Sequence, residues 1–378
     1  MRTPLSVVIG AGGTGGHIYP GLALADALRR AVPEAVVSFV GTRRGLEGEL
    51  IPAAGYRLHT VDMIPFDPAL GARRYLLPAA LLKSAAQARA VLREQGARIA
   101  VGMGGYPSAP VILGARMAGL PSVIHESNAV PGRANRFAAR LTPHIAVAFD
   151  TGHLPGAIIT GMPIAAALAG LDRAALRPAA RAALGVPRGA RLVLVNGGSL
   201  GAARLTEAAL GLAERWRDRE GLHLLIKTGP AALPAARITL HGHPTARAVP
   251  YLDRMDLAYA AADLVVCRAG SATVAELATT GVPAVLVPYP HAPGDHQTHN
   301  ARVLTDAGAG LLLPDAETTA GRLAALVEPL LADPARLAAM SGAAEPGPHA
   351  RAADLLAEHV MRLAAPTVPL LKEHASWN

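Results

Sequence analysis

Cysteine is almost missing from this chain of 378 residues, which contains only Cys267. A single cysteine cannot form an intrachain disulfide, so cysteine usage does not point to an oxidising compartment. Cys267 ends the apolar run 264–267, and we expect it to be a buried core residue. The first residues lack the apolar stretch and small-residue cleavage site of a secretory leader. No apolar window of about 20 residues is free of charges or Gly/Pro interruptions, so we expect no transmembrane helix.

Aromatic residues are also scarce, at 3% of the chain, and there is no run of lysine and arginine. Nucleic-acid-binding surfaces usually combine basic clusters with aromatic side chains, so nucleic acid is not an expected partner. The net charge of +8 and the pI of about 10.1 instead suit a phosphorylated substrate or an anionic membrane face. The length fits two domains of ordinary size.

Short β-branched runs alternate with helical stretches along the whole chain, which predicts an α/β fold built on parallel sheets. Helices are expected at 21–31 and 79–94, and an amphipathic helix at 350–363. Strands are expected at 5–9, 36–40, 56–61, 99–101, 122–125, 145–148, 157–160, 192–196, 222–227, 238–240, 264–267, 284–287 and 310–313.

Each half of the chain opens with a strand that runs into a glycine-rich loop. The first loop contains Gly12-Gly13-Thr14-Gly15-Gly16-His17 and the second Gly197-Gly198-Ser199-Leu200-Gly201. Such loops bring backbone N–H groups close to a ligand at the positive end of a helix. Two of them predict two doubly wound, Rossmann-like domains that face each other across a cleft. We place the domains at 1–163 and 164–345, with a C-terminal helix and tail at 346–378 that returns to the first domain.

The glycines alone leave the ligand open. Gly10-x-Gly12-x-x-Gly15 matches the dinucleotide fingerprint, but an NAD site also needs an acidic residue at the end of the second strand. Residues 40–44 read Val-Gly-Thr-Arg-Arg there. The arginines suit a 2′-phosphate, so an NADP-dependent oxidoreductase remains an alternative. No Gly-Lys-Ser/Thr follows either loop, so the P-loop pattern is absent.

Two further polar blocks follow predicted strands in the second half. In the block 268–276, Gly270, Ser271, Ala272 and Thr273 open a helix whose N–H and hydroxyl groups can hold a diphosphate, and Glu276 can accept hydrogen bonds from a ribose. The alternative is an ordinary helix cap. The block 295–300 reads Asp-His-Gln-Thr-His-Asn. Its histidines have no carboxylates at metal-ligand spacing, so we expect no metal and no cofactor.

These blocks together resemble the MurG family, over about residues 5 to 365. The markers are Gly12-Gly13-Thr14-Gly15-Gly16-His17, Pro20-Gly21-Leu22-Ala23, Met103-Gly104-Gly105-Tyr106, His125-Glu126-Ser127-Asn128-Ala129, Gly197-Gly198-Ser199-Leu200-Gly201-Ala202, the block 268–276 and Asp295-His296-Gln297. Members of this family are inverting GT-B glycosyltransferases. They transfer N-acetylglucosamine from UDP-GlcNAc to a membrane-bound muramyl-pentapeptide lipid, lipid I, to give lipid II in peptidoglycan precursor synthesis.

The resemblance also implies roles for single residues. In the C-terminal domain, the backbone of Leu252 would lie against uracil, Glu276 on the ribose and Gln297 on the sugar. The diphosphate would lie near Ser199 and residues 271–273. From the N-terminal domain, the loop of Thr14, Gly15, Gly16 and His17, together with Asn128, would face the sugar and the acceptor.

Three departures from the family pattern bear on the substrates. Ala165 stands where the family usually has an arginine near the donor, Leu200 replaces a glutamine and Ser127 replaces another. Arg133, Arg136 and Arg268 are possible substitutes for the missing cation. One alternative is therefore a MurG-like transferase that acts on another phospholipid-type acceptor, as in phosphoglycolipid antibiotic synthesis. A non-catalytic nucleotide-sugar-binding protein is a more distant one.

For the reaction, His17 is the expected general base, because an imidazole titrates near neutral pH. Glu126 and His125, at the end of a strand, are reserve candidates. A lipid acceptor also predicts peripheral contact with the cytoplasmic face of the cell membrane. The segment 63–77 mixes apolar residues, an aromatic and arginines, which is typical of a segment in the headgroup region; a partly buried loop is the alternative.

Overall fold

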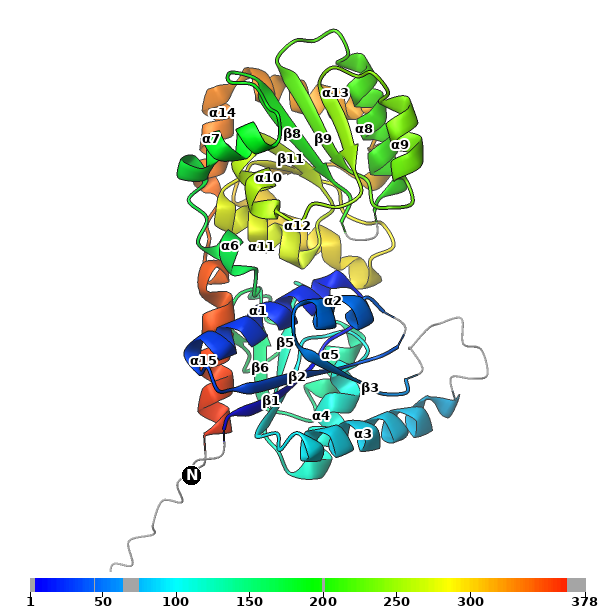
Figure 1. The fold of residues 1–378 in the computed structure, drawn as a ribbon, viewed down its shortest axis with the longest axis vertical. Coiled ribbons are helices and arrows are strands. Elements are labelled where there is room, and N and C mark those ends of the chain that lie inside the picture. The colour runs from blue at the N-terminus through cyan, green and yellow to red at the C-terminus, as the bar shows by residue number, and fades with distance from the viewer. Residues whose placement is uncertain (1–3, 44, 64–74, 199–200, 366–378) are drawn as a thin grey trace, which may run out of the picture.

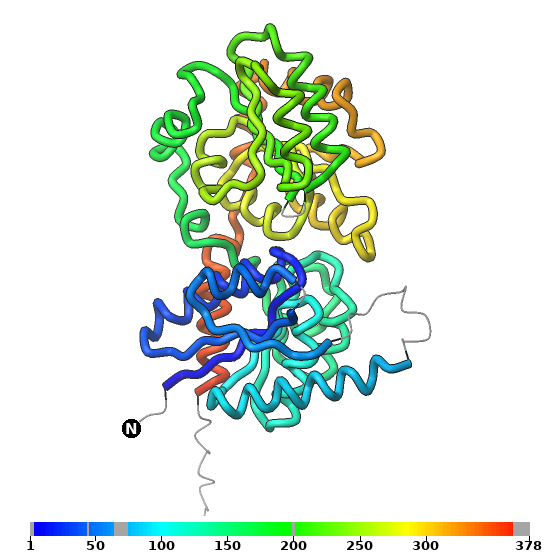
Figure 2. The backbone as a smooth tube through the Cα atoms, turned by 45° about the vertical axis from the view of Figure 1, so that its right-hand side comes forward, coloured from blue at the N-terminus to red at the C-terminus, as the bar shows by residue number. Residues whose placement is uncertain are grey.

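The structure, a computed structural model, describes residues 4–43, 45–63, 75–198 and 201–365. It consists of two lobes joined at a narrower region (Figures 1 and 2). Each lobe is built on one parallel sheet, with the strand order β3-β2-β1-β4-β5-β6-β7 in the first and β10-β9-β8-β11-β12-β13 in the second. The predicted α/β class with two doubly wound domains is confirmed.

The elements of the N-terminal domain, drawn in blue to cyan in Figure 1, are β1 (Ser6–Gly10), α1 (Gly15–Ala31), β2 (Val36–Gly41), α2 (Glu47–Ala53), β3 (Arg57–Thr60), α3 (Leu77–Glu94), β4 (Ile99–Gly102), α4 (Ser108–Ala118), β5 (Ser122–Glu126), α5 (Arg133–Ala138), β6 (His144–Val147) and β7 (Ile158–Ile159). The central strands β1, β4 and β5 are buried throughout because helices cover both faces of the sheet.

The elements that follow are α6 (Ala166–Ala169), α7 (Arg173–Ala183), β8 (Arg191–Asn196), α8 (Ala203–Arg215), β9 (Leu222–Lys227), α9 (Leu233–Thr239), β10 (Ala246–Val249), α10 (Met255–Ala261), β11 (Leu264–Cys267), α11 (Ser271–Thr280), β12 (Ala284–Leu286), α12 (His296–Asp306), β13 (Gly310–Leu312), α13 (Ala320–Ala332), α14 (Pro334–Ala343) and α15 (Ala352–Ala364). Cys267, at the end of β11, is fully buried, as predicted.

Both sheets reverse their winding direction at the same relative place. The chain winds outward from β1 to β3 and returns beside β1 with β4; it does the same from β8 to β10 and returns with β11. Open α/β sheets bind ligands outside the carboxyl ends of the strands at such a reversal. The loop after β5 contacts α12, which follows β12, so the carboxyl edges of both sheets lie toward the junction of the lobes.

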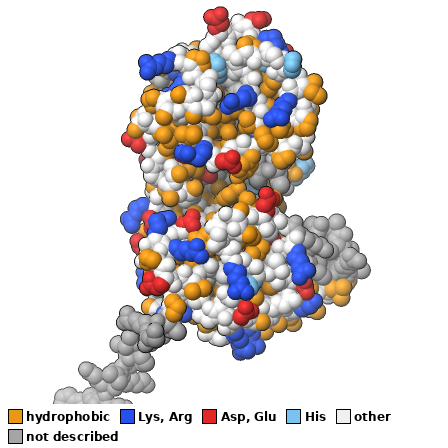
Figure 3. Space-filling view, in the orientation of Figure 1, with side chains coloured by type: hydrophobic (Ala, Val, Ile, Leu, Met, Phe, Trp, Pro, Cys, Tyr) orange, Lys and Arg blue, Asp and Glu red, His pale blue; other side chains and the backbone are white. Residues whose placement is uncertain are grey.

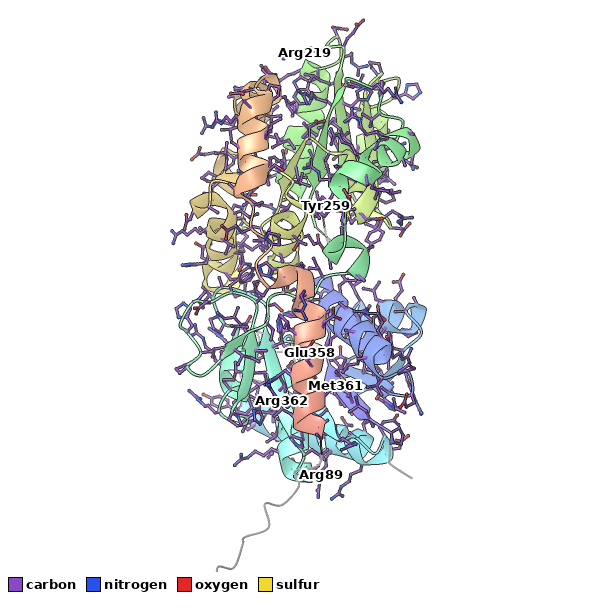
Figure 4. The ribbon with its side chains drawn as sticks, turned by 90° about the vertical axis from the view of Figure 1, so that its left-hand side faces the viewer. Arg89, Arg219, Tyr259, Glu358, Met361 and Arg362 are labelled. Atoms are coloured by element: carbon purple, nitrogen blue, oxygen red, sulfur yellow. The ribbon has the colours of Figure 1, made fainter. Side chains whose placement is uncertain are left out.

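The last helix belongs to the first lobe. Leu356 and Val360 of α15 are fully buried in the same hydrophobic cluster as Leu24 and Leu28 of α1. Figure 4 shows α15 running down the N-terminal domain after the chain has crossed back from the C-terminal one. The two crossings touch, since the backbone N–H of Met162 donates to His349 Nδ1 at 2.9 Å. Two contacting crossings restrict how far the lobes can turn about one another.

Two sequence expectations differ from the structure. Residues 238–240, predicted as a strand, form the end of α9 and its cap, with Ile238 78% exposed, whereas the edge strand is β10. Residues 238–240 have the apolar composition that is typical of a short strand. The alanines of β10 are only weakly hydrophobic, so its sequence does not predict a strand. The first helix also begins at Gly15 instead of residue 21, because glycines in its first turn look like loop.

Among the described residues, no helix combines the length and the apolar character needed to cross a bilayer.

A buried carboxylate fastens α7 to the second sheet. Asp263 precedes β11 and accepts hydrogen bonds from Arg177 at 2.7 Å, Arg181 at 3.3 Å and Arg191 at 3.2 Å, and from the backbone N–H of Leu192 at 2.8 Å. Its side chain is 6% exposed. Asp263 is therefore the shared anion of three cations, and its removal leaves them with uncompensated charge.

We expect Asp263→Asn to lower the free energy of unfolding by about 3 kcal/mol, since an isosteric neutral group leaves three arginines unpaired. Chemical denaturation of both proteins measures the loss. Glu317→Gln is the matched control, because the Glu317–Arg322 pair is about half exposed, and such pairs contribute only about 0–1 kcal/mol. Similar losses in the two variants would contradict the role of Asp263.

Candidate functional site

The first glycine loop is shaped by a carboxylate that the sequence analysis did not identify. Glu47, the first residue of α2, is fully buried. Its Oε2 accepts from the N–H of Gly13 at 3.0 Å, and its Oε1 accepts from the N–H and hydroxyl of Thr42 at 3.0 and 2.7 Å. A Cβ on Gly12 would lie 2.8 Å from Oε1, and one on Gly45 would overlap Oε2. Only glycines let the loop close over this carboxylate.

His17 lies in the first turn of α1, behind the exposed Thr14 and next to Gly15 and Gly16. Its ring packs on the loop after β4, where a Cβ on Gly104 would stand 2.7 Å from Cδ2. Burial lowers the pKa of His17 to about 4, with the backbone of Gly12 acting in the opposite direction and His296 lowering it further. The imidazole is therefore neutral at physiological pH and can accept a proton.

Glu126 is fully engaged in hydrogen bonds within its own loop. Oε1 accepts from the N–H of Asn128 at 2.9 Å, and Oε2 accepts from the N–H of Gly132 at 3.0 Å and from Asn135 Nδ2 at 2.9 Å. The carboxylate is buried and holds the turn between β5 and α5. His125 lies deeper, with its Nε2 2.9 Å from the carbonyl oxygen of Gly161. His17 is partly exposed, whereas Glu126 and His125 are buried.

Asn300 of α12 connects both domains behind the site. Its fully buried amide accepts from the N–H of Ala129 at 2.8 Å and donates to Asn128 Oδ1 and to the carbonyl oxygen of Ala269, each at 3.2 Å. One side chain thus ties the loop after β5 to the turn before α11. The structure brings Asn128 of the N-terminal domain next to the second polar block of the C-terminal domain.

The N-terminus of α11 fits an anion site. Gly270 is its N-cap, and among the described residues no side chain caps the helix. The capping alternative for Ser271 and Thr273 is therefore not observed. Ser271 is buried, whereas Ala272 and Thr273 are partly exposed. The first-turn N–H groups and the helix dipole remain available to a negatively charged ligand.

Glu276 lies one turn further along α11. Its Oε2 accepts from the hydroxyl of the buried Tyr259 at 2.8 Å, and Tyr259 lies inside the C-terminal domain, in the half nearer the junction (Figure 4). Burial raises the pKa of Glu276 to about 7, while the bond from Tyr259 and the charge of Lys227 act to lower it. Glu276 is therefore close to half ionised at neutral pH, unlike an ordinary surface carboxylate.

Two tyrosines from the two domains contact each other. The hydroxyl of Tyr19 on α1 forms a hydrogen bond with that of Tyr251, which precedes the partly exposed Leu252. On α12, Gln297 Oε1 accepts from the N–H of Tyr289 at 2.9 Å, which holds its amide beside the loop after β12. Ser199 and Leu200 lie outside the described residues.

One of the three arginines expected to replace the missing cation already has partners, whereas nothing in the structure tests Arg133 and Arg136. Arg268 is paired with Asp315 at 2.6 Å and donates to the carbonyl oxygens of Val287 and Pro288. Its guanidinium therefore already has partners within the C-terminal domain. Ala165, the N-cap of α6, brings no charge. Lys227 at the end of β9, which the sequence analysis passed over, has its ammonium beside the second glycine loop. Within the described ranges, no cluster of three or more His, Cys, Asp or Glu side chains could hold a metal ion.

Family comparisons agree with this geometry. Residues 7–147 match the glycosyltransferase family 28 N-terminal domain, and residues 192–357 match the glycosyltransferase family 28 C-terminal domain. The chain is 44% identical over 363 residues to the UDP-N-acetylglucosamine–N-acetylmuramyl-(pentapeptide) pyrophosphoryl-undecaprenol N-acetylglucosamine transferase of Saccharopolyspora erythraea, covering 96% of this chain and 95% of the relative. The protein of the same name from Streptomyces avermitilis is 43% identical over 352 residues, covering 93% and 96%.

The chain belongs to the MurG family. A crystal structure of MurG from Acinetobacter baumannii superposes with a TM-score of 0.73 at 29% identity, covering 95% of this chain and all of that one. The calicheamicin glycosyltransferase CalG4 superposes with a TM-score of 0.69 at 16% identity, covering 98% and 100%, which shows the fold alone. The expected GT-B fold and membership among the glycosyltransferases are confirmed.

The contribution of Glu47 to the stability of this MurG-family fold depends on pH. Burial acts to raise the pKa of Glu47, but the hydrogen bonds from Thr42 and Gly13 outweigh it, and the pKa falls below its ordinary value of 4.5. A carboxylate with a lowered folded pKa stabilises the protein above its unfolded pKa, and this contribution is lost as the pH falls through the folded pKa.

We therefore expect Glu47→Gln to be less stable than the wild type by about 1–2 kcal/mol at pH 7, because the amide presents a donor where Gly13 and Thr42 also donate. The difference should shrink below pH 4.5, the unfolded value. Urea unfolding at several pH values measures it, and Glu49→Gln, at an exposed position on the same helix, is the control. A difference that is constant with pH would contradict an ionised Glu47.

Proposed function

We propose that this protein transfers N-acetylglucosamine from UDP-GlcNAc to the muramyl-pentapeptide lipid, giving lipid II. The observation that carries the proposal is the 42–44% identity to the named transferases over nearly the full length of both chains. The site supports it, because the uncapped N-terminus of α11 offers N–H groups to a diphosphate, and α11 contacts α1, the helix that follows the first glycine loop. An NADP-dependent oxidoreductase has no comparable support.

The donor is proposed to lie in the C-terminal domain. The first turn of α11, from Ser271 to Thr273, offers N–H groups to the diphosphate. Glu276 has one carboxylate oxygen bound by Tyr259, and the other can accept from a ribose hydroxyl. The backbone of Leu252 is proposed to contact the uracil, and Gln297 the sugar.

The acceptor is proposed to lie along the N-terminal loops of Thr14, Gly15, Gly16 and Asn128. Its hydroxyl oxygen attacks the anomeric carbon from the face opposite UDP, the bond from that carbon to the phosphate oxygen breaks, and UDP leaves with the electron pair. His17, neutral at physiological pH, accepts the hydroxyl proton. The helix N-terminus stabilises the charge that grows on the diphosphate, so the transfer needs no divalent ion.

The acceptor lipid also needs a membrane-facing surface, and we place it at the start of α3. Tyr75, Leu76 and Leu82 are 74%, 57% and 58% exposed there, and Figure 3 shows hydrophobic side chains at this end of the helix, at the lower right. Arg116 is exposed on α4, which packs against α3. Residues 64–74, the centre of the predicted segment, lie outside the described residues. Co-sedimentation with anionic and with neutral vesicles tests this contact, and equal absence of binding would contradict it.

The transfer itself is tested with labelled UDP-GlcNAc and a set of lipid-linked acceptors that includes lipid I analogues and a phospholipid-type acceptor from outside peptidoglycan synthesis. We expect transfer to lipid I analogues, undiminished by EDTA. His17→Ala should lower kcat by about 10²–10⁴-fold, the usual contribution of a general base. UDP binding without transfer to any acceptor would instead identify a non-catalytic binding protein, and loss of activity in EDTA that magnesium restores would contradict the metal-free mechanism.

We expect Glu276→Ala to weaken UDP binding by about 1.5–3 kcal/mol, the range for a hydrogen bond to a charged group. With Glu276→Gln, binding of uridine should also lose its pH dependence. The wild type should bind uridine more tightly as the pH rises through about 7, where Glu276 ionises and becomes the better acceptor. Isothermal titration calorimetry measures both effects, and unchanged affinity in a folded Glu276→Ala protein would exclude Glu276 as the ribose ligand.

A further inference from the structure

Lys227 lies at the carboxyl edge of the second sheet, beside the second glycine loop. It is the last residue of β9 and pairs in register with Asn196, the last residue of β8. Both strands end at the carboxyl edge of the second sheet, beside its reversal point. The ammonium lies 3.3 Å from the carbonyl oxygen of Gly198, in the glycine loop, and 3.5 Å from Asn196 Oδ1. The centroid of the Tyr251 ring, whose hydroxyl bonds that of Tyr19 in the other domain, lies 5.0 Å from the ammonium.

This ammonium is buried without an anion. Lys227 is 7% exposed, and within the described ranges no carboxylate lies within ion-pair distance of it. Its hydrogen-bond partners are neutral oxygens, and burial lowers its pKa, with the more distant Glu276 acting in the opposite direction. Lysine is seldom buried unless it is paired, because removing an ammonium from water is unfavourable. An arriving anion would supply the missing partner.

We propose that Lys227 binds the diphosphate of the nucleotide-sugar donor. The inference rests on the proposed function, in which α11 receives the diphosphate and Glu276 the ribose. Lys227 pairs with Asn196, and Asn196 pairs in turn with Cys267, three residues before the N-cap of α11, so its ammonium lies at the same edge of the sheet as that helix N-terminus. A lysine acts on phosphate as a compact point charge, and the same charge stabilises UDP as it leaves.

A purely structural role makes a different prediction. If Lys227 only holds the carbonyl of Gly198 and the amide of Asn196, its loss should loosen the loop and affect every ligand of the crevice alike. If it binds diphosphate, its loss should affect only ligands that carry phosphate. UDP and uridine differ in this respect alone.

The test compares Lys227→Met with Lys83→Met by titration calorimetry with UDP and with uridine. Lys83 is exposed and paired with Asp62 at 3.0 Å, which makes it a matched control. We expect Lys227→Met to weaken UDP binding by about tenfold or more, as for the loss of a hydrogen bond to a charged group. Uridine affinity should be unchanged, and Lys227→Arg should recover part of the affinity for UDP. Equal weakening of UDP and uridine, or unchanged UDP affinity, would overturn the proposal.

A second measurement uses the wild-type protein, so it does not depend on the folding of a variant. The chain has three lysines, at 83, 227 and 372. We expect UDP, but not uridine, to slow the modification of Lys227 by an amine-reactive reagent relative to Lys83, as read by peptide mass spectrometry. Equal protection by both ligands would contradict diphosphate binding. Absence of UDP binding to the wild type would instead contradict the proposed function itself.

Discussion

The geometry of the site depends on the hydrogen bonds of the Asn300 side-chain amide. It is fully buried between the domains and satisfies one N–H, one carbonyl and one side-chain oxygen from two loops. An unsatisfied buried amide is costly, so the three partners hold one another in register. The loop of Asn128 and the turn before α11 are therefore positioned by one residue that itself needs no contact with substrate.

The carboxylates around the cleft divide into two groups. Glu47 and Glu126 are buried and saturated by backbone and side-chain donors, and they act as internal caps that shape loops. Glu276 has one oxygen held by Tyr259 and a pKa raised to about 7, so it can respond to a ligand. The proposed site offers an anionic donor helix N–H groups and the ammonium of Lys227, an arrangement that stabilises charge electrostatically.

Much of the fold follows from local sequence. Strands such as β1, β8 and β11 are continuous apolar runs because both faces of a parallel sheet are covered. The hydrophobic pattern gives the wrong element where a buried strand has few strongly apolar residues. The alternating edge strand β10 reads Ala-Arg-Ala-Val, and the apolar end of α9 was predicted as a strand in its place. Edge strands and exposed helix ends depend on which neighbours are present, and periodicity does not report this.

For the site, the sequence by itself determined the two glycine loops, the helix that starts at Ser271 and the family, because each depends on residues adjacent in the chain. Only the tertiary structure decided which charged side chains have an oppositely charged partner. Arg268 is neutralised by Asp315, far along the chain, whereas Lys227 has no carboxylate within ion-pair distance among the described residues. Glu47 acts on a loop 34 residues away. Whether a charge is free or paired depends on distances between elements that only packing sets, and these distances decide its pKa and its availability to a ligand.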